Sequence, residues 1–191
     1  MGQLEPGAFD ARQRVEVVTH VLEPATSGRA KCRGCNQPIQ KDILRLGERL
    51  PNPYGDGEMT LWYHPICAAY KRPEPLLEAL QATSEGLDDA DNLVSITERG
   101  IKHRRLPRVH KAEPAPTGRA RCRCCKELIP KDSWRISVVY FEEGRFQPSG
   151  FVHASCAEQY FGTTDDLVQR VQHFGGNMEA AMIKELRDAL D

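Results

Sequence analysis

Residues 28–35 read Gly-Arg-Ala-Lys-Cys-Arg-Gly-Cys, a short turn in which two cysteines stand two residues apart among basic side chains. A C-x2-C turn can direct both of its sulfurs toward one metal ion. A close copy, Gly-Arg-Ala-Arg-Cys-Arg-Cys-Cys, returns at residues 118–125. These segments, the first and second knuckle, decide how the rest of the chain is interpreted.

Each knuckle is followed at a distance by a histidine and a third cysteine. The chain reads C-x2-C-x28-H-x2-C and then C-x2-C-x27-H-x2-C. Three thiolates and one imidazole saturate a tetrahedral zinc ion, which is typical of a structural site. Because ligand order and spacing both repeat, the sequence predicts two structural zinc ions per chain. The predicted ligands are Cys32, Cys35, His64 and Cys67 for one ion, and Cys122, Cys125, His153 and Cys156 for the other.

Composition limits the classes of protein that the 191 residues can form. The length suits one or two small domains. The sequence has no apolar run long enough to cross a membrane and no signal-peptide pattern at residues 1–10. We therefore expect an intracellular protein, in the cytoplasm with the nucleoid if bacterial or in the nucleus if eukaryotic. Cys124, outside both ligand sets, is a spare thiol or a site of ligand exchange or redox sensing.

Charge is distributed unevenly along the sequence. The formal net charge is only −1, with 26 basic and 27 acidic residues. Residues 99–126, however, hold ten Lys or Arg and one acid, whereas residues 74–98 and the tail from residue 165 are acidic. This segregation predicts a local anion-binding face.

The chain also repeats as a unit of about 90 residues. The knuckle cysteines Cys32 and Cys122 are 90 residues apart, and the histidines His64 and His153 are 89 apart. We predict a leader (1–11), a first finger with a helical extension (12–100), a basic linker (101–107) and a second finger with a helical extension (108–191). Each finger is expected to be a small zinc-dependent α+β domain with an antiparallel sheet and trailing helices. Within the first finger, a strand is expected over 14–22, a helix from Pro65 and a helix over 88–99 that stops at Gly100.

The two units resemble the zinc finger of poly(ADP-ribose) polymerases, which also occurs in DNA ligase III. The resemblance rests on a Ser/Thr-Gly-Arg-Ala segment, the C-x2-C pair, a Lys-Asp pair and an aromatic residue before the H-x2-C histidine. It covers residues 14–72 and 108–161. In the first unit these features are Ser27–Ala30, Lys41-Asp42 and Trp62-Tyr63-His64. In the second they are Thr117–Ala120, Lys131-Asp132 and Phe151-Val152-His153. Nothing in the sequence resembles an ADP-ribosyltransferase or ligase catalytic domain, so we expect no enzyme.

This resemblance implies recognition of DNA strand breaks by structure, not by sequence. It implies that Arg29 and Arg119 reach DNA near the minor groove and that Arg45 and Arg135 hold backbone phosphate. It also implies that a loop in each insert, here residues 50–59 and 140–148, caps the exposed base pair at the break. Both loops depart from the family, since the first is poor in apolar residues and the second contains two acids.

The residue types agree with these expectations. Arginine offers a rigid donor fork that matches phosphate, and aromatic rings stack on exposed bases without regard to sequence. The predicted DNA-binding residues are Arg29, Lys31, Arg33, Arg45, Arg119, Arg121, Arg123 and Arg135, and the candidates for base stacking are Tyr54, Tyr140, Phe141 and Phe146. We expect a non-catalytic protein of DNA repair or the damage response. Its partner would be nicked or broken DNA, with repair proteins as further candidates and neither a membrane nor a small-molecule substrate.

Several alternatives stay open from the sequence. The knuckle arginines Arg29 and Arg119 can instead neutralise the anionic zinc sites. The whole chain can be a zinc-stabilised scaffold for protein interaction, without recognition of DNA ends, and a catalytic role for Cys124 or one zinc is the weakest alternative. His20 and His110 suit packing more than ligation, while the remaining histidines outside the ligand sets, His103 and His173, look like surface residues.

Overall fold

The computed structural model describes residues 20–82 and 90–190. Its first half, the first finger, contains β1 (Val21–Pro24), β2 (Leu44–Pro51), β3 (Glu58–Tyr63), α1 (Pro65–Lys71), α2 (Pro73–Ala82) and α3 (Ala90–Lys102). The second finger begins after the 3-10 turn η1 (Leu106–Arg108). It contains β4 (Val109–Pro114), β5 (Trp134–Glu142), β6 (Arg145–His153), η2 (Ala154–Cys156), α4 (Ala157–Phe161), α5 (Leu167–Gly175) and α6 (Ala180–Leu190).

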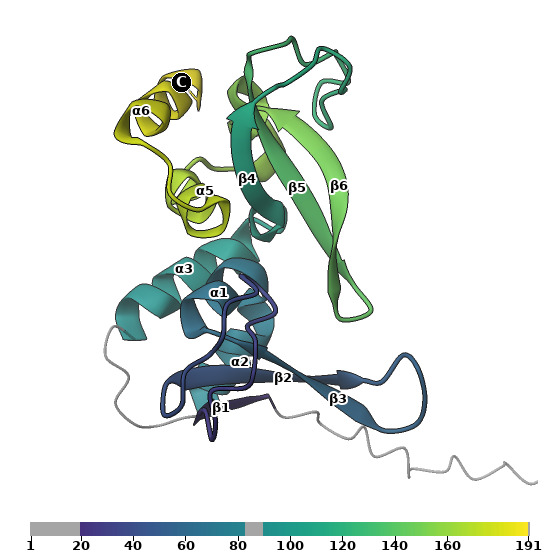
Figure 1. The fold of residues 1–191 in the computed structure, drawn as a ribbon, viewed down its shortest axis with the longest axis vertical. Helices are drawn as coiled ribbons and strands as arrows, with labels where there is room; N and C mark the ends of the chain where they lie inside the picture. Colours follow the sequence, from purple (N-terminus) through teal and green to yellow (C-terminus); the bar gives the residue numbers. More distant parts are fainter. Residues whose placement is uncertain (1–19, 83–89, 191) are drawn as a thin grey trace, which may run out of the picture.

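The predicted repeat and the α+β class are confirmed. Both sheets are antiparallel and three-stranded, with strand orders β1-β2-β3 and β4-β5-β6, and helices follow each sheet (Figure 1). The Lys-Asp pairs form the turns that lead into β2 and β5, because Asp42 and Asp132 both adopt a left-handed backbone, with φ of 65° and 64°. Aspartate tolerates this conformation better than most residues. The two fingers therefore share their turn chemistry as well as their ligands.

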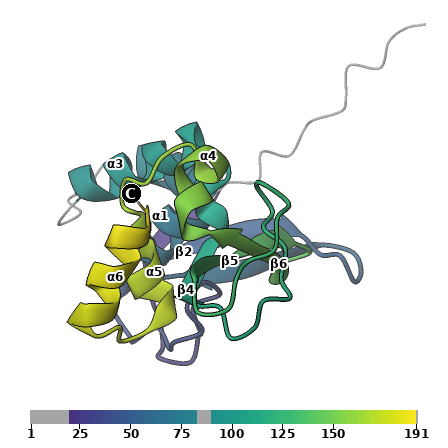
Figure 2. The same ribbon diagram turned by 90° about the horizontal axis from the view of Figure 1, so that it is seen from above.

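The two fingers pack against each other through α5 of the second finger. Figure 1 and the view from above in Figure 2 both place α5 beside the helices of the first finger. Phe174 of α5 is buried in the core of the first finger, among residues such as Cys67 and Tyr70. The core of the second finger is built from its own residues, such as Ile136 and Leu167. The first finger thus depends on a side chain that the second finger supplies.

Polar contacts join the fingers around the same helix. The buried Lys71 donates a hydrogen bond to the carbonyl oxygen of Val109. Arg170 of α5 donates to the carbonyl oxygen of Tyr70 at 2.8 Å. Asp166 accepts from Arg170 at 2.6 Å and from Arg99 of α3 at 2.9 Å. These buried groups satisfy one another across the contact, as buried polar groups must.

The β5–β6 hairpin makes a second contact with the first finger. At its tip Gly144 has a φ of +76°, and a Cβ there would lie 2.7 Å from Cε of Met59. Only glycine suits a position that combines this backbone with so close an approach. Next to it, the ring of Phe141 lies 3.9 Å from the guanidinium carbon of Arg72, which is itself paired with the fully buried Glu48. The two fingers are therefore joined at two places.

Some expectations need correction or lie beyond what the structure describes. Gly100 does not end a helix, because α3 continues to Lys102. Instead, a Cβ on Gly100 would lie 3.2 Å from Cγ of Pro73, so the small residue lets α3 approach α2. The strand expected over 14–22 falls mostly outside the described residues, as do residues 88–89 of the expected helix. No helix among the described residues is long and apolar enough to span a membrane.

Candidate metal centres and nucleic-acid interface

The first predicted ligand set comes together between the sheet and α1. Cys32 and Cys35 stand in the first knuckle, His64 is the residue before α1, and Cys67 lies in the first turns of that helix, which Pro65 opens. His64 Nδ1 lies 3.4 Å from Sγ of Cys35 and 3.8 Å from Sγ of Cys67. All four ligand atoms lie within 4.8 Å of one another.

The second ligand set has the same arrangement. His153 Nδ1 lies 3.4 Å from Sγ of Cys125 and 3.9 Å from Sγ of Cys156. Its backbone N–H lies 3.3 Å from Sγ of Cys122, as the N–H of His64 does from Sγ of Cys32. Again the four ligand atoms lie within 4.8 Å of one another.

These separations fit zinc. Zn–S bonds of about 2.3 Å and Zn–N bonds of about 2.0–2.1 Å place the ligand atoms of a tetrahedral site roughly 3.5–3.8 Å apart. Three cysteines and one histidine fill all four positions, so each set could hold one structural zinc, in agreement with two zinc ions per chain. His153 Nε2 lies 3.2 Å from the carbonyl oxygen of Leu128, which orients the ring with Nδ1 toward the sulfurs.

The local electrostatics favour a thiolate at one cysteine of each set and oppose it at others, where burial raises the pKa. A hydrogen bond from Cys67 lowers the pKa of Cys32 to about 5, and the same contact raises the pKa of Cys67. In the second set, burial opposes ionisation of Cys122, yet backbone N–H groups around it, beginning with that of His153, lower its pKa to about 7. A divalent cation replaces such shared protons, so each set is prepared to bind metal with release of protons.

The two centres differ in how far they are covered. Cys32 and Cys67 are buried, whereas in the second set Cys125 is exposed and Cys156 is half-buried. His173 of α5 lies against the first centre, with Nε2 3.0 Å from Sγ of Cys67. The expectation that His173 is a surface residue was therefore wrong. No signal in the sequence indicated this contact, because the two residues are 106 positions apart and belong to different repeats.

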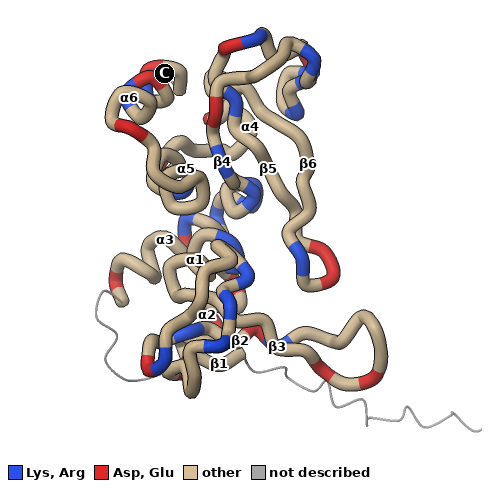
Figure 3. Tube along the Cα trace, viewed as in Figure 1, with Lys and Arg blue, Asp and Glu red and all other residues tan. Residues whose placement is uncertain are grey.

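The predicted DNA-binding residues fall into two groups. Six side chains are exposed on the knuckles: Arg29, Lys31, Arg33, Arg119, Arg121 and Arg123. The other two, Arg45 and Arg135, are only 6% and 7% exposed. Each pairs with the glutamate directly opposite on the neighbouring strand, Glu23 or Glu113. Figure 3 shows the basic residues of the second knuckle at the far end of its finger.

Arg45 and Arg135 also lie over aromatic rings. The guanidinium carbon of Arg45 is 3.5 Å from the ring centroid of Trp62, and that of Arg135 is 3.7 Å from the ring of Phe151. Each guanidinium is thus held between a carboxylate and a ring that stands two residues before a zinc-ligating histidine. In this structure both residues brace the sheet, and their predicted contact with phosphate stays a prediction.

The four candidates for base stacking also separate into two pairs. Tyr54, in the β2–β3 loop, is 71% exposed, and Tyr140 of β5 is 39% exposed. Phe141 and Phe146 face each other with ring centroids 5.1 Å apart and pack against the core of the first finger. The two phenylalanines are therefore occupied by the contact between fingers, whereas the two tyrosines present free ring surface.

Three adjoining hollows, each lined by basic side chains, extend from the first knuckle toward the second. The first, of about 280 Å³, is lined by Lys31, Arg33 and Arg145, and shares Phe146 with the second. The second, of about 220 Å³, contains Arg104 and Arg108 beside Arg72, and one acid, Glu74, borders it. The third, of about 440 Å³, shares Arg108 and adds Arg105, Arg123 and Lys126. Together these hollows contain eight basic side chains that we call the basic track: Lys31, Arg33, Arg145, Arg104, Arg105, Arg108, Arg123 and Lys126.

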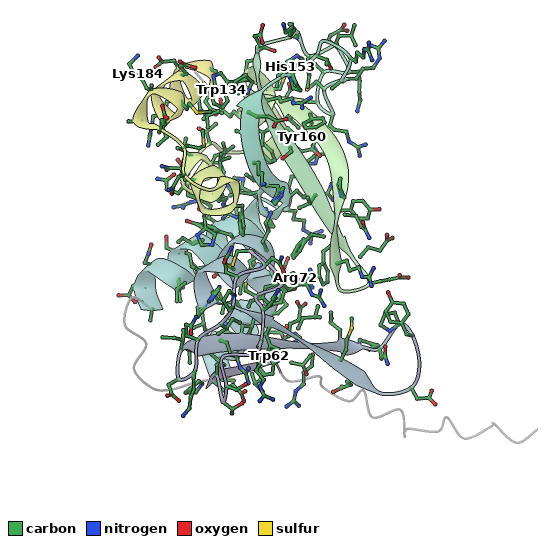
Figure 4. All side chains as sticks on the ribbon, in the orientation of Figure 1. Trp62, Arg72, Trp134, His153, Tyr160 and Lys184 are labelled. Atoms are coloured by element: carbon green, nitrogen blue, oxygen red, sulfur yellow. The ribbon has the colours of Figure 1, made fainter. Side chains whose placement is uncertain are left out.

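The middle of the basic track comes from the basic stretch 99–126 that the sequence predicted as an anion-binding face. Arg104, Arg105 and Arg108, at and beside the expected linker, line it, whereas Arg29, Arg119 and Arg121 are exposed outside the three hollows. Within residues 20–82 and 90–190, no track residue forms an ion pair. Figure 4 labels Arg72, which lies where the β5–β6 hairpin approaches the first finger. Arg145 at the hairpin tip had no place in the sequence-based set.

Comparison with known proteins finds a family that matches the first finger. Residues 23–103 match the family described as the poly(ADP-ribose) polymerase and DNA-ligase Zn-finger region. Poly [ADP-ribose] polymerase 1 of Oryza sativa subsp. japonica is 30% identical over 143 residues, which is 70% of this chain and 14% of that protein. Poly [ADP-ribose] polymerase of Sarcophaga peregrina is 28% identical over 138 residues, 63% of this chain and 14% of that protein.

A vertebrate relative matches this chain with similar identity and coverage. Poly [ADP-ribose] polymerase 1 of Gallus gallus is 29% identical over 133 residues, which is 60% of this chain and 13% of that protein. The chain therefore spans about one seventh of the length of these relatives.

Proposed function

Since residues 23–103 are a zinc finger of the poly(ADP-ribose) polymerase type, we propose that this chain binds nicked or broken DNA by its structure, without catalysis. The proposal places it in DNA repair or the damage response, with repair proteins as further partners. Both zinc ions would be structural, because four protein ligands leave no open coordination position at either centre.

The basic track is the observation that carries the proposal. A phosphodiester backbone presents a negative charge at regular intervals, and cations that neutralise phosphates supply most of the affinity for DNA of any sequence. The track joins the two knuckles through hollows that share Phe146 and Arg108, although the chain as a whole has a net charge of −1. Charge concentrated on one path in a near-neutral protein is expected for local phosphate binding.

The two exposed tyrosines supply what a break sensor needs beyond phosphate binding. Stacking of a base on an aromatic ring contributes about 1–3 kcal/mol and requires a base face that an intact duplex does not offer. We propose Tyr54 and Tyr140 for this role, since they have free ring surface. Arg45 and Arg135 then support the interface by bracing the two sheets, unless binding releases them from Glu23 and Glu113.

Fluorescence anisotropy with nicked, blunt-ended and intact duplexes tests the proposal. We expect tighter binding to the nicked and blunt duplexes, with affinity that falls as salt rises. The double variant Arg104→Gln with Arg108→Gln should weaken binding to all three and reduce the slope of log K against log salt by roughly 0.9 for each phosphate that is no longer neutralised. The matched control is Lys184→Gln with Arg187→Gln, which removes two exposed positive charges from α6.

Two outcomes would contradict separate parts of the proposal. Equal, weak binding to all three duplexes would contradict break recognition. A salt slope that the Arg104 and Arg108 substitutions leave unchanged would contradict phosphate binding by the basic track. The alternative of a zinc-stabilised interaction scaffold is favoured by the packing of Phe141 and Phe146 against the first finger. Under that alternative, Arg29→Ala with Arg119→Ala would leave partner binding intact, whereas under the DNA proposal this pair weakens DNA binding.

A further inference from the structure

We propose that the second finger completes the first zinc centre, with His173 acting as a positioning residue that donates its Nε2–H to the zinc-bound thiolate of Cys67. This inference concerns how the metal is held and is independent of any ligand on the protein surface. It assigns a role to a histidine that lies outside both predicted ligand sets.

The geometry of the contact supports donation to sulfur. His173 Nε2 lies 3.0 Å from Sγ of Cys67. A cysteine bound to zinc is a thiolate and carries no proton, so the hydrogen in this contact must come from the imidazole. The four ligand atoms of the first centre lie within 4.8 Å of one another and already saturate a tetrahedral ion. His173 therefore acts on a ligand and is not itself one.

The imidazole is held in place by its neighbours. Its ring meets Tyr70 edge-on at a centroid distance of 5.4 Å and Phe174 at 4.8 Å. Phe174 in turn reaches the first knuckle, because a Cβ on Gly34 would lie 3.7 Å from Cε1 of Phe174. The end of α5 thus covers the first centre with one polar and one apolar side chain, both rigidly packed.

The second centre provides an internal comparison. Among the described residues, no side chain from outside its ligand set forms a hydrogen bond with the sulfurs of Cys122, Cys125 or Cys156. Cys124, the nearby spare cysteine, directs its thiol to Oε1 of Gln159 at 3.3 Å instead. Only the first centre therefore has a covering donor, and loss of that donor should affect the first metal alone.

A hydrogen bond to a metal-bound thiolate draws charge from the sulfur and fixes its direction. Loss of such outer partners typically weakens metal binding by about 10–100-fold. For His173→Ala we therefore expect zinc to leave one of the two centres about ten times faster when a chelator is added. His173→Gln retains an N–H donor of similar reach and should restore a large part of the retention. Gln169→Ala, an exposed change on the same helix, is the matched control.

Cadmium-113 NMR of the fully substituted protein separates a hydrogen bond from simple packing. We expect two resonances, of which one shifts in His173→Ala while the other stays in place. In the native protein, that same resonance should show a coupling to the Nε2 proton of His173, which needs no variant and so survives any failure of His173→Ala to fold. The proposal is overturned if this coupling is absent, if both centres release metal equally faster, or if His173→Gln behaves like His173→Ala.

Discussion

The two fingers share one construction and differ in what surrounds their metal. Both have a three-stranded antiparallel sheet, the same four ligands and an arginine held between a glutamate and a ring. The first centre, however, lies under α5 of its neighbour, whereas in the second centre Cys125 is exposed. The ligand spacing therefore fixes how the metal is coordinated, but not how well it is shielded.

The β2–β3 and β5–β6 hairpins also differ in exposure, but here the one in the first finger is the more exposed. In the first finger, the β2–β3 loop leaves Tyr54 exposed. In the second, the β5–β6 hairpin rests on the first finger through Phe141, Phe146 and the close approach of Gly144 to Met59. The second finger thus covers its neighbour at two places and leaves its own metal open. The second finger therefore stabilises the first, although the two share one repeated sequence pattern.

Loss of a metal ligand should disrupt the contact between the two fingers more than any other change. Cys67→Ser should remove one zinc, unfold the first finger and free α5, because a structural zinc contributes on the order of 10–16 kcal/mol of apparent binding energy. Cys156→Ser should also remove one zinc, and the first centre should keep its own ion but release it faster to a chelator, because α5 no longer covers it. Metal analysis with circular dichroism measures both effects. Cys124→Ser should keep two zinc ions, and a Cys67→Ser protein that keeps two would contradict the assignment.

Truncation of the shared aromatic residue should have the next largest effect. Phe174→Ala should destabilise the first finger by about 3–5 kcal/mol although the residue belongs to the second, because it leaves a cavity in the core that contains Tyr70. Phe161→Ala should act on the second finger's own core instead. Hydrogen exchange of the β2 and β5 amides distinguishes the two. Faster exchange in β5 alone for Phe174→Ala would be incompatible with the described contact.

The smallest effect concerns the dependence of stability on pH. Burial, with a smaller contribution from Arg170, lowers the pKa of Lys71 to about 7 from its ordinary value of 10.5. Between these values the unfolded chain holds a proton that the folded chain lacks, so this group makes stability rise with pH and has no further effect below pH 7. The slope is at most about 1.4 kcal/mol per pH unit.

Lys71→Met isolates that contribution. The variant should lose the rise between about pH 7 and pH 9 in urea denaturation of the zinc-loaded protein, since the amine that titrates in this range has been removed. The native protein measured in parallel is the reference. A curve that keeps its full slope in Lys71→Met would assign the pH dependence to another group.

Sequence reasoning was strongest where chemistry depends on local spacing. The eight metal ligands, the repeat and the helix opened by Pro65 could be predicted because each follows from residues close in sequence or from one ligand pattern used twice. The pairing of Arg45 with Glu23 was missed, although a signal existed. Arg135 and Glu113 repeat the same pair at the same separation of 22 residues, which fits a salt bridge between adjacent strands.

The contacts between fingers could not be predicted in the same way. The apolar pattern of α5 predicts that one face is buried, but it does not say in which core Phe174 lies. His173 has no counterpart in the repeat pattern that would have drawn attention to it. Phe141 and Phe146 suited an exposed stacking loop equally well until the hairpin was seen to rest on the first finger. Such long-range choices depend on tertiary packing, which periodicity does not contain.

The cover over the first centre also sets an order of events during synthesis. His173 follows Cys67 by 106 residues, and ribosomes add about 5–20 residues per second. Roughly 5–20 seconds therefore pass between the translation of the first four metal ligands and the translation of the helix that covers them. Metal uptake can occur in that interval while the sulfurs are still open, and the arrival of the last helices then closes the ion in.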